Sequence, residues 1–189
     1  MVSVSLFAIV MTMSLGAILS IIDGNKKAQA INSVSNNLNF AVDSMVRDIK
    51  TGYGYSCTGG TPDQLTKTSD IGSDKNGCDV TVPVQEIDLI STITGDKRGV
   101  SYLKLTDSSG VNRIYKRTSD NSNSLYPVTS AEVDITTLNF YIDNPVTSTY
   151  SGQPKVFLVI KGTAKVNPTQ TSDFAIQTLI SQRNLNLPK

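Results

Sequence analysis

The first part of the chain is apolar on every side. Residues 2–22, VSVSLFAIVMTMSLGAILSII, contain no charged side chain and no proline. As an α-helix, a run of this length spans about 31 Å, which matches the hydrocarbon core of a bilayer. The pattern therefore predicts a transmembrane helix over residues 1–22.

The next part of the chain is apolar on one side only. Hydrophobic residues recur there at intervals of three or four, the period of one helix face. These residues are Ile31, Val34, Leu38, Val42, Met45 and Ile49. The spacing predicts an amphipathic helix over residues 23–52 that packs on a sheet, and Gly52 and Gly54 end it. We expect one rod about 70 Å long, with any weak point at Gly24.

Downstream, short segments of alternating polar and apolar residues are separated by turn residues, which is typical of β-strands. The segments are residues 80–84, 86–94, 100–106, 112–117, 132–143, 155–166 and 173–183. Residues 107–110 and 167–171 have the composition of hairpin turns, whereas 57–78 and 118–126 are polar loops. The pattern predicts an antiparallel meander over 53–189 whose last two strands cover the helix. The expected fold class is α+β.

The amino-acid composition excludes several classes of function. The chain has no histidine, which removes Ser-His-Asp and Cys-His catalysis and the common catalytic zinc sites. A formal net charge of +1 argues for no particular charged partner. Cys57 and Cys78 are the only cysteines, and they flank a polar segment. We expect them to form a disulfide that staples this loop, with two reduced thiols as the alternative.

The apolar run has a second interpretation, a cleaved secretory signal. Such a signal would have a basic start, a shorter apolar stretch and a cleavage site close behind it. The triplet Ala28-Gln29-Ala30 resembles such a site, but it follows a polar break at residues 23–27. We therefore favour the membrane helix.

The order of these segments resembles that of type IV pilins and of the pseudopilins of type II secretion. The opening MVSVSLFAIVMTMSLGAILSIIDGNKKAQA is similar to the mature N-terminus of that family after its first few residues. FAVDSMVRDIKTGYGYSC resembles the end of the helix in minor pseudopilins of the J type and in similar minor pilins. QPKV at 153–156, FAIQT at 174–178 and SQR at 181–183 are similar to the closing strands of the same group.

The resemblance implies a pilin-like fold and a structural role without catalysis or cofactor. The chain would be a minor subunit of a type IV pilus or type II secretion filament, at the filament tip. It would cross the bacterial inner membrane once, with the β-domain extracytoplasmic. Its partners would be other pilin or pseudopilin subunits, the inner-membrane assembly platform and the lipid bilayer, and no small-molecule substrate is implied.

Six residues of the apolar run are candidates for assembly between helices. Small or weakly polar residues let helices approach closely in lipid. We expect close helix contact at Ser5, Thr12 and Gly16, and lipid or bundle packing at Leu6, Ile9 and Met13. An anchor without specific contacts is the alternative.

The chain departs from the family at its start. Members carry a short basic leader, cut between a Gly and a Phe or Met, and a Glu at the fifth mature position that pairs with a neighbour's amino terminus. None of these is present, and Met1 aligns near the seventh mature position. A misplaced start and a member that is not processed in this way are alternatives, and we expect a truncated member. Lys26 and Lys27 would place the following residues in the cytoplasm under the positive-inside rule. The cysteine pair and the missing leader favour the opposite side.

Three further patterns in the sequence could carry chemistry or bind a ligand. Ser101 and Lys104 match the Ser-x-x-Lys spacing of some acyl enzymes, but on a strand they point to opposite faces. An oxygen-rich loop, which some pseudopilins use for calcium, contains Asp70, Asp74, Asn76 and Asp79. A solvated turn without metal is our expectation there. Basic residues that could bind DNA are Lys97, Arg98, Arg113, Lys116 and Arg117. We favour a solvated hairpin and expect no nucleic acid.

A rival from another functional class fits the same pattern. A single-span, membrane-anchored extracellular binding module or adhesin would also need an apolar helix and a β-domain, but it would not polymerise. A membrane-tethered hydrolase that uses carboxylates is less favoured, because no pair of acidic residues stands out.

Overall fold

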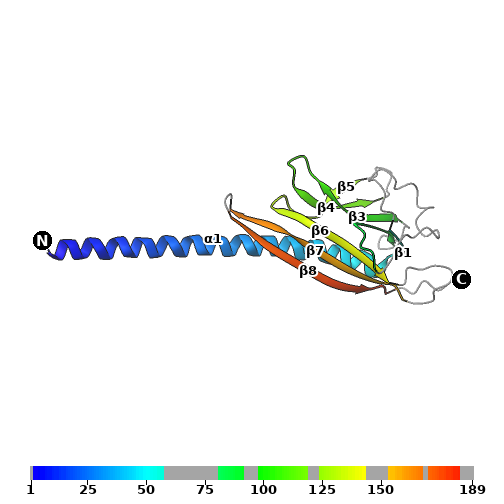
Figure 1. The fold of residues 1–189 in the computed structure, drawn as a ribbon, viewed down its shortest axis with the longest axis horizontal. Coiled ribbons are helices and arrows are strands. Elements are labelled where there is room, and N and C mark those ends of the chain that lie inside the picture. Colours follow the sequence, from blue (N-terminus) through cyan, green and yellow to red (C-terminus); the bar gives the residue numbers. More distant parts are fainter. Residues whose placement is uncertain are drawn as a thin grey trace.

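The computed structural model describes residues 2–57, 81–91, 98–118, 124–143, 153–167 and 170–183. In these ranges one long helix is joined to two antiparallel sheets, which agrees with the expected α+β class. About half of the helix projects from the domain as a free rod, and the other half lies along the sheets (Figure 1).

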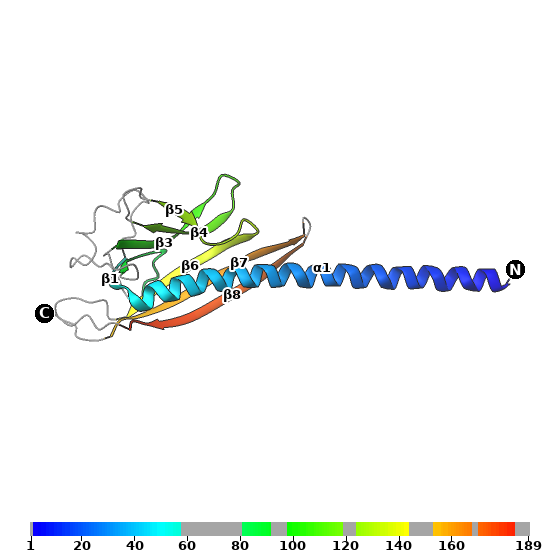
Figure 2. The ribbon, with the colours of Figure 1, turned by 180° about the vertical axis from the view of Figure 1, so that it is seen from behind.

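The helix α1 runs without a break over Val2–Thr51. The expected single rod is confirmed, and Gly24 does not interrupt it. A glycine inside a helix costs only about 1 kcal/mol relative to alanine, and the long runs on both sides propagate the helix through it. Figure 2 shows the same straight rod from behind.

The strands form two sheets rather than one layer. Sheet A contains β1 (Tyr53–Ser56), β2 (Glu86–Ser91), β3 (Arg98–Thr106), β4 (Asn112–Thr118) and β5 (Leu125–Pro127), paired in that order. Sheet B contains β6 (Val133–Asp143), β7 (Lys155–Asn167) and β8 (Gln170–Ser181), also in chain order. Each sheet is an antiparallel meander, because each strand pairs with the next one along the chain.

Several boundaries differ from those expected. The segment 80–84 is no strand where it is described, since only Val84 forms a single bridge, to Phe140 of β6. The loop expected over 118–126 includes the start of β5, and β1 was not predicted. Both strands are short, and their pairing with β4 and β2 sets their conformation more than their own sequence does.

The amphipathic half of α1 buries its stripe as the spacing predicts. Val34, Leu38, Met45 and Ile49 are each at most 4% exposed. Val42 is half-buried and packs against the same core, which includes buried residues of β7 and β8. Those residues are Val156, Leu158, Ile160 and Ile180. Burial of each large side chain contributes about 2 kcal/mol, so this stripe holds the helix on the domain.

Ile31 departs from the expected stripe. It is 39% exposed, although it has the right helical spacing. It lies at the end of the packed half, where the sheets stop covering α1, beside Phe174 and Ile176 of β8. Helical periodicity locates a face but does not show where its cover ends.

The carboxyl end of α1 is tied to both sheets by its own free carbonyls. The last carbonyls of a helix have no partner inside it and need one elsewhere. Tyr55 of β1 donates its hydroxyl to Ile49 O at 2.6 Å, and the Arg183 N–H donates to Lys50 O at 2.8 Å. The buried Gln182 donates its Nε2 to Gly52 O at 2.8 Å. These bonds fix the direction of the rod relative to the domain.

Candidate functional site

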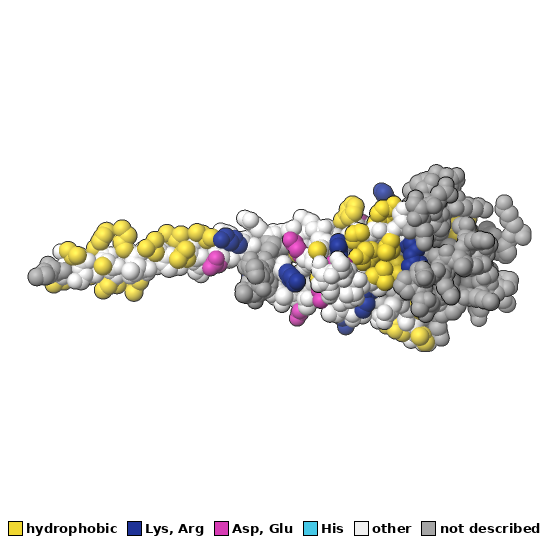
Figure 3. Space-filling view, turned by 90° about the horizontal axis from the view of Figure 1, so that it is seen from above, with side chains coloured by type: hydrophobic (Ala, Val, Ile, Leu, Met, Phe, Trp, Pro, Cys, Tyr) yellow, Lys and Arg dark blue, Asp and Glu magenta, His cyan; other side chains and the backbone are white. Residues whose placement is uncertain are grey.

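The free half of α1 is a fully exposed apolar surface. Over residues 2–29 every described side chain is exposed, including Leu6 at 65%, Ile9 at 54% and Met13 at 72%. Apolar side chains line this rod, and charged ones first appear near its junction with the domain (Figure 3). The helix is long and apolar enough to cross a membrane.

The six candidate assembly residues share one side of this rod. Ser5, Ile9, Thr12 and Gly16 follow one another at intervals of four, three and four, and Leu6 and Met13 lie beside them. Thr12 donates its hydroxyl back to the carbonyls of the helix, at 2.9 Å from Ile9 O. Nothing lies within 4 Å of a Cβ placed on Gly16. The structure leaves this face uncovered, with the Thr12 hydroxyl satisfied inside the helix.

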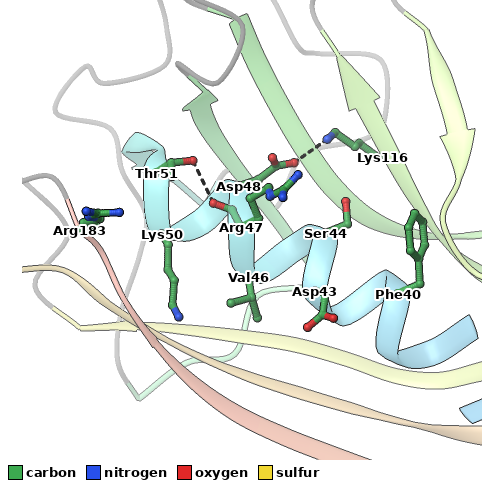
Figure 4. Close-up of a pocket in the computed structure, with 10 residues that line it drawn as sticks. All are labelled: Phe40, Asp43, Ser44, Val46, Arg47, Asp48, Lys50, Thr51, Lys116 and Arg183. Carbon is green, nitrogen blue, oxygen red and sulfur yellow. Dashed lines mark hydrogen bonds and ion pairs between the residues drawn. The ribbon is translucent and has the colours of Figure 1, made fainter. Parts of the chain in front are cut away.

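A buried carboxylate joins the other half of α1 to sheet A, and the sequence pattern did not reveal it. Asp48 is 4% exposed and lies between the stripe residues Met45 and Ile49. It accepts a 2.5 Å hydrogen bond from the Tyr102 hydroxyl of β3 and pairs with Lys116 Nζ of β4 at 2.5 Å. Figure 4 shows the pairing of Lys116 with Asp48. The only hint of this contact in the sequence was an acidic residue among the apolar residues of the stripe.

The tyrosine of this junction is held in its neutral form. Burial raises the pKa of Tyr102 far above its ordinary value, and the negative charge of Asp48 raises it further. Its hydroxyl therefore stays a donor, while the Lys116 ammonium lies 5.6 Å from the centre of its ring. The Ser44 hydroxyl, 3.2 Å from the Tyr102 hydroxyl, completes the contact. Bonds this directional fix where α1 sits along sheet A.

An open hollow of about 780 Å³ adjoins the junction. It is bounded by α1 between Phe40 and Thr51, by Lys116 and by Arg183 (Figure 4). Phe40 is 72% exposed at its rim. Its lining combines charged side chains with the apolar Phe40 and Val46, and it is open to solvent, so we assign it no ligand.

A second polar cluster lies within sheet A. Asp88, Ser101 and Arg117 occupy one row across β2, β3 and β4, and all are buried. Ser101 donates its hydroxyl to Asp88 at 2.5 Å, and Arg117 lies 3.9 Å from the carboxylate of Glu86. Burial raises the pKa of Glu86 to about 7, with the charge of Asp88 adding to the rise and that of Arg117 opposing it.

Glu86 makes stability depend on pH. Its folded pKa lies above the unfolded value, so its contribution to stability is present below about pH 4.5 and is lost as pH rises through about 7. We expect Glu86→Gln to flatten the fall in unfolding free energy between pH 5 and pH 8 by on the order of 1 kcal/mol, since partial solvent access screens the effect. Urea unfolding of the full chain at both pH values measures it. Glu132→Gln, at an exposed position, is the control, and an unchanged slope in Glu86→Gln would contradict the assignment.

The other residues singled out from the sequence do not form common sites. Arg113 donates its Nε to Thr129 O at 2.9 Å, and Lys116 and Arg117 pair with acids, so these three do not form a free basic patch. Ser101 bonds to Asp88 and Lys104 to Thr136 O, on opposite faces of β3.

Part of the predicted cysteine and calcium chemistry lies outside the described residues. Cys57 is buried and disulfide-bonded. Its expected partner Cys78 lies outside the described ranges, as do Lys97 and the expected calcium residues. Those are Asp70, Asp74, Asn76 and Asp79. Among the residues that the structure describes, no cluster of three or more potential metal ligands occurs.

Comparison of the chain with protein-family models, with curated proteins and with solved structures finds no match in any of the three.

Proposed function

We propose that this chain is a structural subunit of a membrane-anchored filament of the type IV pilin or type II secretion pseudopilin kind. In this role the free half of α1 inserts in the membrane and then packs against the helices of neighbouring subunits. The β-domain stays outside the membrane. The observation that carries the proposal is one unbroken helix, fully exposed and apolar in its first half and packed on the domain in its second.

The rigidity of the junction supports this role. A flexible tether would suffice to hold a binding module at a membrane, since such a module needs only attachment. Here the α1 carbonyls bond to Tyr55 and Arg183, and Asp48 bonds to both β3 and β4. A rod fixed to its domain passes the geometry of helix packing on to the domains, as a regular filament requires.

Photo-crosslinking in native membranes tests the proposal. A benzophenone side chain placed at Ile9 or Met13, on the face of Ser5 and Gly16, is expected to form adducts with a second protein helix. Met11 lies at similar depth on the opposite face of the helix and is also apolar and exposed, at 49%, so it is the matched control. We expect it to react mainly with lipid.

Two outcomes separate the candidate functions. Protein adducts from Ile9 and Met13 but few from Met11 support assembly through one helix face. Only lipid adducts from all three positions would point instead to a single-span binding module that does not polymerise.

A further inference from the structure

Among the described residues, no strand pairs with the outer edge of β8. Gln182 N–H bonds to Pro154 O in register with the β7–β8 ladder, so the even-numbered residues of β8 bond to β7. The odd-numbered residues from Thr171 to Ser181 point their N–H and C=O groups away from β7. In the part of the chain that the structure describes, no backbone hydrogen bond joins these residues to another element. In Figures 1 and 2, β8 forms the border of the domain farthest from β5.

This edge has little of the usual protection against strand addition, and Asp173 is its one charged side chain. Proteins guard exposed edges with charged residues, lysine above all, with proline, with bulges or with very short strands. At the edge of sheet A, β5 has three residues and ends in Pro127. In contrast, β8 has twelve residues, with no proline, no lysine and regular register from Thr171 to Ser181. An unguarded edge of this length is suited to pairing with an extended segment.

The outer face of sheet B shows what such a segment would contain. Tyr141, Phe157 and Leu179 lie in register across the three strands, and Leu179, at the edge, is 65% exposed. This apolar row ends abruptly at the edge, so an apolar residue opposite Leu179 would extend it.

Three exposed lysines on the same face add a charge preference. Lys155, Lys161 and Lys165 of β7 lie beside small β8 residues, Ser181, Ala175 and Thr171. A long lysine side chain can reach across a small neighbour toward the next strand. Acidic residues of an added strand would therefore meet positive charge opposite these three positions. Opposite Asp173, the added strand would carry an uncharged residue.

A cavity of about 280 Å³ opens beside the inner face of β8. Its apolar lining comes from α1, β7 and β8, and includes the partly exposed Ile31. The apolar lining residues are Ile31, Val34, Leu38, Ala164, Phe174 and Ile176. A strand added to β8 would direct alternate side chains toward this cavity, so apolar residues there would cover Ile31.

We propose that the β8 edge binds an extended acidic segment of a partner protein by strand addition, with apolar side chains filling the cavity beside α1. A second copy of this chain fits less well. The cavity places the start of β8 beside Ile31 and Leu38, and Gln182 bonds at the helix end, so β8 and α1 run in the same direction. Antiparallel pairing of two β8 edges would point their helices in opposite directions, which two copies anchored in one membrane cannot do. The edge itself does not depend on filament formation, but the exclusion of a second copy rests on the proposed membrane anchor.

Peptide binding to the full chain in detergent tests the proposal. The probe is the fluorescein-labelled peptide EVLTTVEVTSE, written to lie antiparallel to residues 181–171 with its acids opposite the lysines. We expect saturable binding by fluorescence anisotropy, weakened about tenfold by Gln177→Pro because one outward donor and the fit around it are lost. The Gln177 N–H points away from β7, so proline breaks no ladder bond there. Gln177→Val keeps this N–H and is the matched control.

The variant Lys161→Glu provides a second test, which does not require that the fold tolerate a proline in β8. This variant is expected to bind the acidic peptide less tightly and to bind the basic peptide KVLTTVKVTSK better than the unmodified chain does. Absence of binding to the unmodified chain, or equal binding by Gln177→Pro, would overturn the proposal. So would a dimer, seen by light scattering without peptide, that Gln177→Pro dissociates, because the occupant would then be a second copy.

Discussion

Asp48→Ala is expected to lower the unfolding free energy of the domain by about 3 kcal/mol. The change removes the acceptor of the Tyr102 hydroxyl and the partner of the Lys116 ammonium. Tyr102 is fully buried and keeps only Ser44 nearby, so its hydroxyl loses its strongest bond. Lys116 is partly exposed and can turn to water, which limits the loss. Urea unfolding of the full chain, followed by the near-ultraviolet circular dichroism of its tyrosines, measures the change.

Asp43→Ala is the matched control for this variant. Asp43 is an acid on the same helix, five residues earlier, and its side chain is exposed. Its removal is expected to change the unfolding free energy by no more than about 0.5 kcal/mol. Equal effects of the two variants would show that the junction contributes little to holding α1 on sheet A.

Gly162→Ala is expected to lower the unfolding free energy by about 2–3 kcal/mol. Gly162 lies in β7, where sheet B and the phenyl ring of β8 crowd its Cα. A Cβ there would run into the carbonyl oxygen of Asp134 and come within 2.8 Å of Phe174 Cζ. The ring can move, but the Asp134 carbonyl belongs to β6 and moves only with its strand. Thermal unfolding of the full chain would show the loss as a lower Tm.

Gly24→Ala is the control for the glycine effect. Nothing lies within 4 Å of a Cβ at Gly24, which is in the middle of the exposed helix. Alanine there should favour the helix by about 1 kcal/mol and leave the Tm of the domain unchanged or higher. If Gly162→Ala is tolerated as well as Gly24→Ala is, the close packing of β6 against β7 does not constrain the fold.

Most of the strands could be predicted from the sequence, but their grouping could not. Alternation identified the segments that became β2, β3, β4, β6, β7 and β8, because alternation reflects one buried face per strand. It did not show that β5 and β6 belong to different sheets. The segment between β5 and β6 is short and gives no sequence signal for a change of sheet. The change depends instead on which face each meander buries.

The long apolar half of α1 could be predicted from the sequence, whereas the buried junction at Asp48 was missed. A long run without charge predicts an apolar helix of membrane-spanning length, since every residue contributes to the signal independently. The contact of Asp48 with Tyr102 and Lys116 joins residues more than fifty positions apart, and no local pattern encodes it.

Local sequence patterns were enough to predict the rod: where it is apolar all round, where it is apolar on one side, and that both halves form one helix. Those properties follow from neighbours along the chain, which periodicity records directly. Folding alone sets that Ile31 lies uncovered, that Asp48 is buried against sheet A, and that no other described strand pairs with the outer edge of β8. Each of these depends on which distant segments meet and where their contact ends, so it could emerge only once the chain had folded.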